Sequence, residues 1–434
     1  MNEIEKEQRE EQLYQLTTLV AGDLSLQEVL DKLAEAAVKI TGVKACSIRL
    51  LDEQAGDLKM RSTYGLSETY RNKGVVSKND PVIKAAFSGE AVVLDDMRVD
   101  GRVKYKEATI AEGLVSQLTV AMEFRGKPTG VIRLYSPKPK RFYEDDIALA
   151  RAVASQCAVA ITNAKLVASA VEASRMSEQM RLAGVIQRRM IPEKAPEIPG
   201  LDIAATYIPC FEVGGDLYTF FKVTENRIAI DIADVIGKGL PAAIVMSWFR
   251  GAVRAAGDTV MEMRPAGLLE MEDAARLRYI INKINGMACD ECRDGEFITL
   301  FHAAFDVAEN KLIYCNCGHE PTVLIRDGEL IDLDKGGLVL GVDRDSEYEI
   351  GTLELKDGDC FIFYTDGLID AVNFEGDLWG RQQMLEAAKQ FASCPAEQII
   401  KNVLGYRRRF VGLASQVDDT SMVVVKVNRA GKQD

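Results

Sequence analysis

Histidine is almost absent from this sequence, with His302 and His319 the only two in 434 residues. A zinc hydrolase that relies on several imidazole ligands, a histidine phosphorelay and a haem-binding sensor would each be hard to build from so few. Acidic side chains are abundant by contrast, with 66 aspartates and glutamates. Whatever chemistry the chain performs is therefore expected to depend on carboxylates.

The sequence also lacks the features of an exported, membrane-spanning or nucleic-acid-coating protein. Its first residues contain no apolar core of a signal peptide, and no uninterrupted apolar run is long enough to cross a bilayer. The nine cysteines are an odd number in a chain without an export signal, so reduced thiols are expected. The formal net charge of −13 opposes binding to nucleic-acid phosphates. We expect a cytoplasmic protein that binds neither membranes nor nucleic acids.

The length of the chain predicts two or three domains. Strand-like and helical segments are mixed on both sides of a long helical stretch, which predicts an α+β fold for each half. One hairpin is signalled by the turn residues Arg125 to Pro128 between two apolar, strand-like runs. The predicted divisions are an N-terminal helix (1–22), a sensory domain (23–165), a helical linker (166–198), a catalytic domain (199–428) and a tail (429–434).

The stretch after Glu144 contains no proline or glycine before Gly184, which predicts one long helix. Small and apolar residues recur three and four positions apart between Ile147 and Val171, a heptad seam. Such a seam has little to bury against in a lone helix. It therefore predicts a parallel homodimer.

The apolar register of this helix then shifts. Arg175 and Glu178 occupy the next core positions, and apolar residues resume one position later at Met176. Because buried unpaired charge is costly, we expect the helix pair to repack here. Residues 182–190 would then either transmit a signal to the strand carrying Asp216 or serve as a passive tether, and the sequence favours neither.

Four aspartates stand where predicted strands meet turns: Asp216, Asp234, Asp366 and Asp418. An aspartate at the end of a buried strand is costly unless something cationic satisfies it. Each one alone is commonly just a turn residue. Together they predict a shared cation site, with glycines beside three of them that let the backbone approach closely.

Mg²⁺ and Mn²⁺ are the cations that favour carboxylate, carbonyl and water ligands. Two such ions can share a water and lower its pKa, so that a bridging hydroxide attacks phosphorus in line. This chemistry requires no protein nucleophile. The lack of an evident Ser-His or Cys-His pair therefore does not count against it.

The C-terminal half resembles a known family in a series of motifs: VGGDLY, ADVIGKGLPAA, FITLFHAAFD, CNCGHEP, GLVLGV, FYTDGLIDA and DDTSMVVV. Over nearly all of residues 200–428 it is similar to the SpoIIE-type branch of the metal-dependent PPM (protein phosphatase 2C-like) phosphatases. The resemblance implies an αββα sandwich with two divalent cations at one end. It also implies hydrolysis of phosphoserine or phosphothreonine in a bacterial regulator, such as a STAS-type antagonist of an anti-sigma factor.

Matched residue by residue, the resemblance implies that Asp216 and Asp234 bind the metal pair, with the carbonyl of Val235. Asp366 and Asp418 would lie nearer the catalytic metal, and Asp418 is preferred to Asp419. Two positions depart from the family pattern without removing a ligand: Thr219 replaces a usual acid, and Ile236 a usual small residue. Lys238 is either a phosphate contact or a solvated turn lysine, and base rates favour the second.

Residues 23–165 resemble a GAF domain in stretches such as SLQEVLDKLAEAAVKITGVKACSIRLLD and GEAVVLDDMRVDGRVKYKEATIAEGLVSQL. The family senses varied small molecules or proteins, or serves as a dimerisation module. The signature associated with cyclic-nucleotide binding is missing. No histidine lies in this half, which disfavours haem and bilin. The sequence therefore does not identify the small molecule or protein that this domain would sense.

Three alternatives remain at this point. Gly214-Gly215-Asp216 resembles part of the GGDEF motif of diguanylate cyclases, but the following residues differ and the other aspartates would go unexplained. A phosphatase fold without turnover would be a binding module. A zinc site could use four cysteines, with His319 nearby. Those cysteines are Cys289, Cys292, Cys315 and Cys317.

Overall fold

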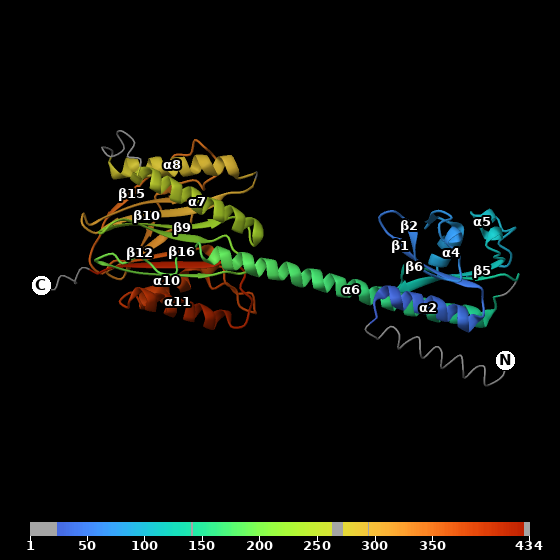
Figure 1. The fold of residues 1–434 in the computed structure, drawn as a ribbon. Coiled ribbons are helices and arrows are strands. Elements are labelled where there is room, and N and C mark those ends of the chain that lie inside the picture. Colours follow the sequence, from blue (N-terminus) through green and yellow to red (C-terminus); the bar gives the residue numbers. More distant parts are fainter. Residues whose placement is uncertain (1–23, 140–141, 263–271, 294, 429–434) are drawn as a thin grey trace. The chain divides into compact units, whose positions relative to one another are not determined.

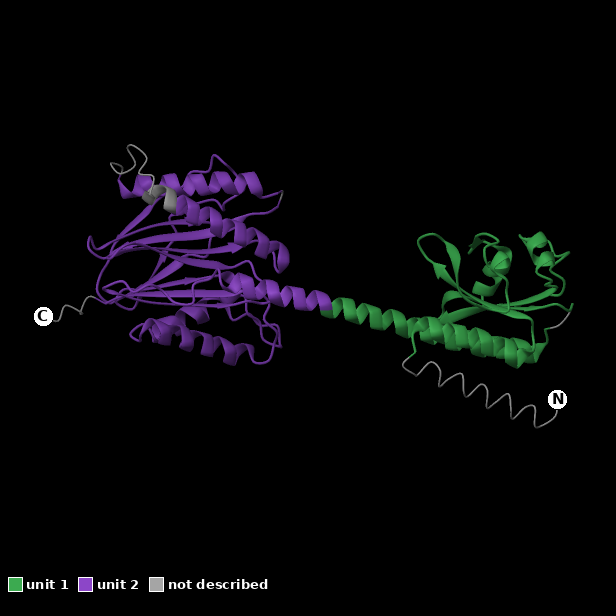
Figure 2. Cartoon of the chain, in the orientation of Figure 1, with its two compact units in different colours: residues 1–174 green, residues 175–434 purple. Residues whose placement is uncertain are grey.

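The computed structural model describes residues 24–139, 142–262, 272–293 and 295–428 (Figure 1). The chain divides into two compact units, residues 1–174 and 175–434 (Figure 2). The division falls within α6 (Glu144–Arg188), the single long helix that the sequence predicts. The predicted N-terminal helix (1–22) and tail (429–434) lie outside the described residues.

The first unit is built on an antiparallel sheet in the order β3-β2-β1-β6-β5-β4. The predicted hairpin is β5–β6, where Arg125 and Gly126 both have positive φ values, 51° and 78°, as a tight two-residue turn requires. The strands are β1 (Ala45–Asp52), β2 (Asp57–Tyr64), β3 (Val76–Ser77), β4 (Val92–Leu94), β5 (Ser116–Phe124) and β6 (Lys127–Ser136).

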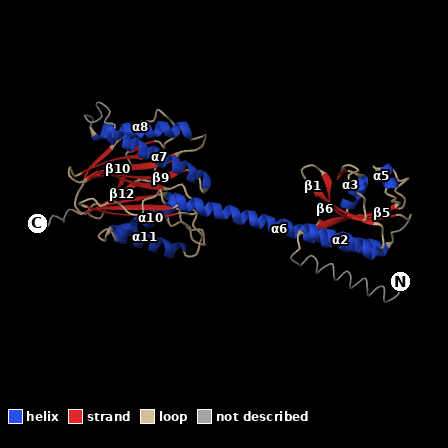
Figure 3. Cartoon of the chain, in the orientation of Figure 1, coloured by secondary structure: helices blue, strands red, loops and turns tan. Residues whose placement is uncertain are grey.

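Helices cover both faces of this sheet. On one face, α2 (Leu26–Thr41) and the first half of α6 share a core with alternate residues of β1 and β6, such as Ile48 and Ile132. Ser25 begins α2 with a capping box to Glu28. The opposite face carries the shorter helices (Figure 3). These are α3 (Glu68–Arg71), α4 (Pro81–Phe87) and α5 (Lys106–Ala111).

The second unit is a sandwich of two sheets between two pairs of helices (Figures 1 and 3). One sheet has the order β14-β11-β10-β9-β8, with β15 beside β11, and the other has the order β13-β12-β16-β17-β7. Their inner faces meet through aromatic rings: Phe305 and Phe361 have centroids 5.1 Å apart. The αββα layering implied by the resemblance is confirmed.

The first sheet of the sandwich has strands β8 (Leu217–Thr224), β9 (Arg227–Val235), β10 (Ile298–Asp306), β11 (Lys311–Cys317), β14 (Gly336–Gly337) and β15 (Gly351–Glu354). The second sheet has strands β7 (Leu201–Ile208), β12 (Thr322–Arg326), β13 (Glu329–Leu333), β16 (Cys360–Tyr364) and β17 (Thr420–Val427). The helices are α7 (Leu240–Glu262), α8 (Asp273–Glu291), α9 (Asp366–Ile369), α10 (Gly380–Gln390) and α11 (Ala396–Val411).

The structure corrects the expectation that the heptad seam of α6 has little to pack against within a single chain. Ala150, Ala154, Cys157 and Ile161 are buried in the first unit's own core, so half of the predicted seam is already packed against the sheet. Every residue from 165 to 179 is exposed instead. Sequence periodicity marks a face that is buried, but it does not say against what.

By length and composition, α6 is the one helix among the described residues that could cross a membrane, with a window of mean hydropathy 1.3. Within the protein, 44% of that window is buried. A core helix of a soluble protein passes the same test, so a single such helix is weak evidence for a span.

Candidate functional site

The four predicted aspartates lie at the same end of the sandwich. Asp216 directly precedes β8, and Asp234 is the penultimate residue of β9. Antiparallel pairing of Leu217 with Ala233 brings these two strand ends together. In the other sheet, Asp366 follows β16 and Asp418 precedes β17, and these strands are likewise antiparallel neighbours.

A hydrogen bond joins the two sheets at this end. Thr365 donates its hydroxyl to Asp216 over 2.7 Å, and the Asp216 carboxylate is only 1% exposed. Burial raises the pKa of Asp216 well above its usual range, and the neighbouring carboxylate of Asp234 adds to the shift. This link connects residues that are far apart in the chain.

Negative charge accumulates around Asp234. Burial, followed by charge repulsion from Asp366 and Asp418, raises the pKa of its carboxyl to about 7. The pKa of Asp366 is raised by burial and then by Asp418. The four carboxylates are therefore close enough to oppose each other's ionisation, which a bound cation would reverse.

The adjacent Asp418 and Asp419 point to different partners. Asp419 is buried and accepts hydrogen bonds from the backbone N–H groups of Cys210 and Gly215, both at 2.7 Å. It therefore orders the loop that carries Asp216. The sequence motif did not indicate this role for Asp419. A signal was present, because successive side chains in an extended segment point to opposite faces, so Asp418 and Asp419 were expected to have different partners.

Asp418 pairs with a cation from the chain itself. The Lys238 ammonium lies 2.7 Å from a carboxylate oxygen of Asp418 and donates to the carbonyl of Val417 at 2.6 Å. The expectation of a solvated turn lysine holds only in part, because the side chain is 44% exposed yet its charged end is bound. Ile236, the second departure from the family pattern, is exposed in the same turn.

Glycines bring the backbone close to these side chains. A Cβ atom on Gly215 would lie 2.9 Å from the carbonyl oxygen of Val235 and 3.6 Å from the Asp234 carboxylate. A Cβ on Gly367 would collide with the backbone of Asp419. The Val235 carbonyl thus faces the loop before Asp216.

Among the described residues, no three His, Cys, Asp or Glu side chains converge as a complete set of metal ligands. Three carboxylates at this end have partners within the chain: a hydroxyl for Asp216, an ammonium for Asp418 and backbone amides for Asp419. The donors still fit a hard divalent cation, because they are oxygens with a surplus of negative charge and already attract a lysine.

The cysteines considered for zinc do not gather into such a set within the described residues either. Cys315 and Cys317 are buried on β11 with sulfurs 3.9 Å apart. His319 contacts the Thr299 hydroxyl and the carbonyl of Tyr364, at 2.8 and 3.1 Å. These partners account for the imidazole without a metal.

The end of α6 holds the loop that precedes Asp216. Gln187, 5% exposed, donates to the carbonyl of Gly214 at 2.7 Å and accepts from its N–H at 3.0 Å. One turn earlier, a Cβ on Gly184 would collide with the carbonyl of Glu212. The linker helix therefore touches the candidate site through its last turns.

Comparison with known proteins agrees with this architecture. The family model of Stage II sporulation protein E (SpoIIE) matches residues 224–428, and that of the GAF domain matches residues 23–162. The chain therefore contains a GAF domain followed by a SpoIIE-family domain. The SpoIIE match contains three of the four aspartates and begins after Asp216.

The SpoIIE-family domain has relatives among curated proteins. Phosphoserine phosphatase RsbU of Bacillus subtilis (strain 168) is 29% identical over 230 residues, which are 52% of this chain and 64% of that protein. Protein IcfG of Synechocystis sp. is 28% identical over 260 residues, 56% of this chain and 40% of that protein. The chain thus spans less than two thirds of either relative.

A solved structure shares the fold of the SpoIIE-family domain. The SiaA-PP2C domain of Pseudomonas aeruginosa superposes with a TM-score of 0.51 at 19% sequence identity. The match covers 59% of this chain and 99% of that domain. At this identity the likeness shows the fold alone.

Proposed function

We propose that the SpoIIE-family domain is a metal-dependent protein serine/threonine phosphatase. The observation that carries the proposal is that Asp216, Asp234, Asp366 and Asp418 lie at neighbouring strand ends on the same end of the sandwich, with raised pKa values for Asp216, Asp234 and Asp366. The names of relatives such as phosphoserine phosphatase RsbU support the same reaction.

Asp216 and Asp234, with the carbonyl of Val235, would hold two divalent cations, Mn²⁺ or Mg²⁺, together with Asp366 and Asp418. Such ions lower the pKa of a coordinated water and neutralise charge on a phosphoryl group. The chain's own residues position that chemistry: Thr365 fixes the Asp216 carboxylate, and Asp419 fixes the loop before it. If the Lys238 ammonium moved away from Asp418, the Asp418 carboxylate would be free to bind a metal.

The substrate we propose is phosphoserine or phosphothreonine in a regulatory protein, of the STAS-type anti-sigma factor antagonist class, in the cytoplasm. We place the phosphatase domain at 199–428, the helical linker at 166–198 and the GAF domain at 23–165. Pairing of β7 with β17 over residues 201–208 supports the earlier start of the phosphatase domain, because the second sheet is incomplete without β7.

The test is hydrolysis of p-nitrophenyl phosphate and a phosphoserine peptide by the full chain, with Mn²⁺, with Mg²⁺ and with excess EDTA. We expect release of phosphate that requires a divalent cation. No release under any condition would contradict the proposal and leave a binding module. Incubation with GTP provides the other discriminating arm, since formation of a cyclic dinucleotide would identify a cyclase instead.

We also propose that the chain is a homodimer, which the exposed part of α6 supports. Leu166, Val167, Val171 and Met176 are each more than half exposed, at 62, 63, 63 and 58%. A helix without packing partners is marginal in water, and apolar side chains along it gain stability when a second copy covers them.

Light scattering of the full chain at micromolar concentration should therefore give twice the monomer mass of 47.8 kDa. Val171→Glu should shift the protein towards the monomer, because it would bury a charge in the helix pair. Glu172→Gln, at the next position, which is also exposed, should leave the dimer intact. A monomeric wild-type chain would contradict the proposal.

A further inference from the structure

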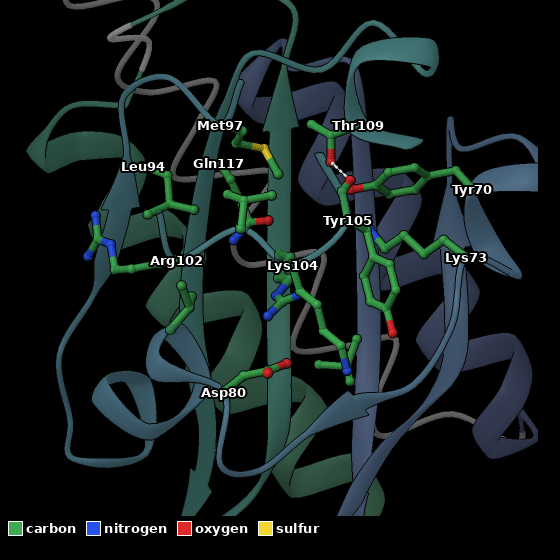
Figure 4. Close-up of a pocket in the computed structure, with 14 residues that line it drawn as sticks. Tyr70, Lys73, Asp80, Leu94, Met97, Arg102, Lys104, Tyr105, Thr109 and Gln117 are labelled. Atoms are coloured by element: carbon green, nitrogen blue, oxygen red, sulfur yellow. Dashed lines mark hydrogen bonds between the residues drawn. The ribbon is translucent and has the colours of Figure 1, made fainter. Parts of the chain in front are cut away.

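The pocket of the GAF domain is largely filled by the chain's own side chains, among them Tyr70, Met97 and Tyr105 (Figure 4). Its free volume is about 40 Å³, room for a few water molecules. Small-molecule sites begin at about 300 Å³, so an organic ligand does not fit this pocket as it stands. A second set of buried polar groups lies in the SpoIIE-family domain, next to the four aspartates.

His319 lies where the chain crosses from one sheet of the sandwich to the other. The crossing comprises residues 318–321, between the end of β11 and the beginning of β12. It lies at the aspartate end, because His319 contacts Thr299, the strand partner of Asp234. With only 7% of its surface exposed, His319 is enclosed between the sheets.

The imidazole of His319 connects the two sheets. Its Nδ1 lies 2.8 Å from the hydroxyl of Thr299 on β10, and its Nε2 lies 3.1 Å from the carbonyl oxygen of Tyr364 on β16. Tyr364 stands two residues before Asp366 in the chain. The ring therefore joins the strand end beside Asp234 to the strand end that leads to Asp366.

The partners of the ring define where its proton lies. A carbonyl oxygen only accepts, so Nε2 carries the hydrogen and donates it to Tyr364. Burial lowers the pKa of His319 to about 4, so the ring is neutral at neutral pH and Nδ1 accepts from the Thr299 hydroxyl. Both ring nitrogens are satisfied, which gives the buried side chain one definite orientation.

The main chain at His319 is held as firmly as the ring. Asn316, itself 6% exposed, donates its side-chain amide to the carbonyl of His319 at 2.9 Å and accepts from the His319 N–H at 2.7 Å. Gly318 has a φ of 68°, and a Cβ there would collide with the side chain of Val339. A group locked by packing and hydrogen bonds in this way can position its neighbours.

The link through His319 differs in kind from the one between Thr365 and Asp216. That bond uses the carboxylate of a candidate ligand, which a cation would also engage. His319 bonds a hydroxyl and a backbone carbonyl instead, and neither belongs to the side chain of a candidate ligand. It can therefore hold the two strand ends at one separation whether or not cations are bound.

We propose that His319 is a positioning residue for the metal site, which holds β10 and β16 at the separation that lets Asp234 and Asp366 serve the same pair of cations. These aspartates belong to different sheets, so only contacts between the sheets fix their spacing. Ligands must be held within about 0.5 Å of the productive geometry. The inference rests on the proposed function, because it assigns a role within that same site.

The test is Mn²⁺ binding by the full chain, measured by calorimetry, together with the Mn²⁺ dependence of p-nitrophenyl phosphate hydrolysis. His319→Ala should weaken Mn²⁺ binding about tenfold, the lower end of the effects seen for groups that support metal ligands. The Mn²⁺ concentration for half-maximal rate should rise by the same factor. The rate at saturating Mn²⁺ should fall less than about threefold, because excess cation draws the site into its binding geometry.

Two amide variants separate the bridge from the loss of bulk. In His319→Gln, the amide nitrogen can lie near the position of Nε2 and donate to Tyr364, so the Mn²⁺ affinity should return to within about threefold of the wild type. His319→Asn carries the same amide on a side chain that is one methylene shorter. It cannot reach the Tyr364 carbonyl and should bind Mn²⁺ as weakly as His319→Ala.

Thr299→Val removes the other partner of the ring. This variant should also weaken Mn²⁺ binding, because the imidazole then connects to β16 alone. The double variant with His319→Ala should bind Mn²⁺ about as weakly as His319→Ala by itself, since both changes break one link and their effects are not additive.

His302→Ala is the matched control, at a second histidine of the same sheet. Phe301 packs against Phe363 of the other sheet, so His302 points to the opposite face of β10. There its Nδ1 lies 2.6 Å from the carboxylate of Asp231. We expect a lower thermal midpoint with the wild-type Mn²⁺ affinity, since a contact that only stabilises the domain does not change the spacing of the ligands.

The outcomes separate this inference from the proposed function. Equal Mn²⁺ affinity in His319→Ala and the wild type would overturn the inference alone, as would equal affinity in His319→Gln and His319→Asn. A wild-type chain that binds no divalent cation would overturn both. Mn²⁺ binding without release of phosphate would refute the phosphatase, and calorimetry would still decide the role of His319. If His319→Ala does not fold, the two amide variants and Thr299→Val decide.

Discussion

Asp216→Asn should abolish Mn²⁺-dependent hydrolysis while the protein stays folded. Asparagine keeps the size of the side chain and can still accept the hydrogen bond from the Thr365 hydroxyl, which is 2.7 Å long in the wild type. It loses the negative charge that would bind a divalent cation, so we expect at least a roughly 100-fold lower rate with p-nitrophenyl phosphate. Calorimetry should show weaker Mn²⁺ binding in parallel.

The fold should not suffer from this change. Asp216 is buried beside other carboxylates, and burial already raises its pKa. Removing a buried charge that has no cation relieves repulsion, so the thermal midpoint of the metal-free protein should be unchanged or higher. A reduced rate with a normal melting curve would therefore assign the loss to the site.

Asp366→Asn should behave in the same way, and Asp327→Asn provides its matched control. Asp366 and Asp327 both directly precede a glycine, but Asp366 begins α9, whereas Asp327 lies in the β12–β13 hairpin at the other end of the strands. Its variant should keep the wild-type rate. Near-normal hydrolysis by Asp216→Asn or Asp366→Asn would refute the assignment of these ligands.

Gln187→Ala should lower the rate about 2- to 30-fold, the range that corresponds to about 0.5–2 kcal/mol of lost coupling. The variant leaves the N–H and carbonyl of Gly214 without their partner, at a cost of about 1–3 kcal/mol for each buried group. The loop two residues before Asp216 would then be held less firmly. The Mn²⁺ concentration for half-maximal rate should rise.

Gly184→Ala tests the same contact by an independent route. Alanine favours an isolated helix by about 1 kcal/mol over glycine, so a passive tether would gain stability and keep its activity. A Cβ at this position collides with the carbonyl of Glu212, so a docked helix must move away from the loop. We therefore expect lower activity despite a more stable helix.

Gln179→Ala is the control for both variants, since it makes the same kind of change on an exposed turn of α6. Its activity should equal that of the wild type. If Gln187→Ala and Gly184→Ala also hydrolyse p-nitrophenyl phosphate at the wild-type rate, the linker helix does not influence the site. The tether would then be the correct interpretation of residues 182–190.

The helices and strands of each half could be predicted because they follow from local rules, whereas the αββα layering was implied only by the resemblance to the PPM phosphatases. Alternating strands, the turn at Arg125 and Gly126, and the cap at Ser25 each depend on neighbouring residues. The long helix followed from the absence of proline and glycine. The surface against which this helix packs could not be predicted. Ala150 and Cys157 are buried against α2 and β1, whose residues lie about 100 positions earlier in the chain.

The candidate ligands could be predicted from the order of the motifs, because four aspartates at strand ends together indicate a cation site, although each one alone is commonly a turn residue. The contacts that hold these ligands in place could not be predicted. The contacts of Asp216 with Thr365, Lys238 with Asp418 and Gln187 with Gly214 link distant or unremarkable residues. Arg49 and Arg133, which are buried in the GAF domain, likewise resemble surface residues in their strands. Only tertiary packing buries them, because strand alternation assigns a face and the helices placed over that face decide whether water reaches it.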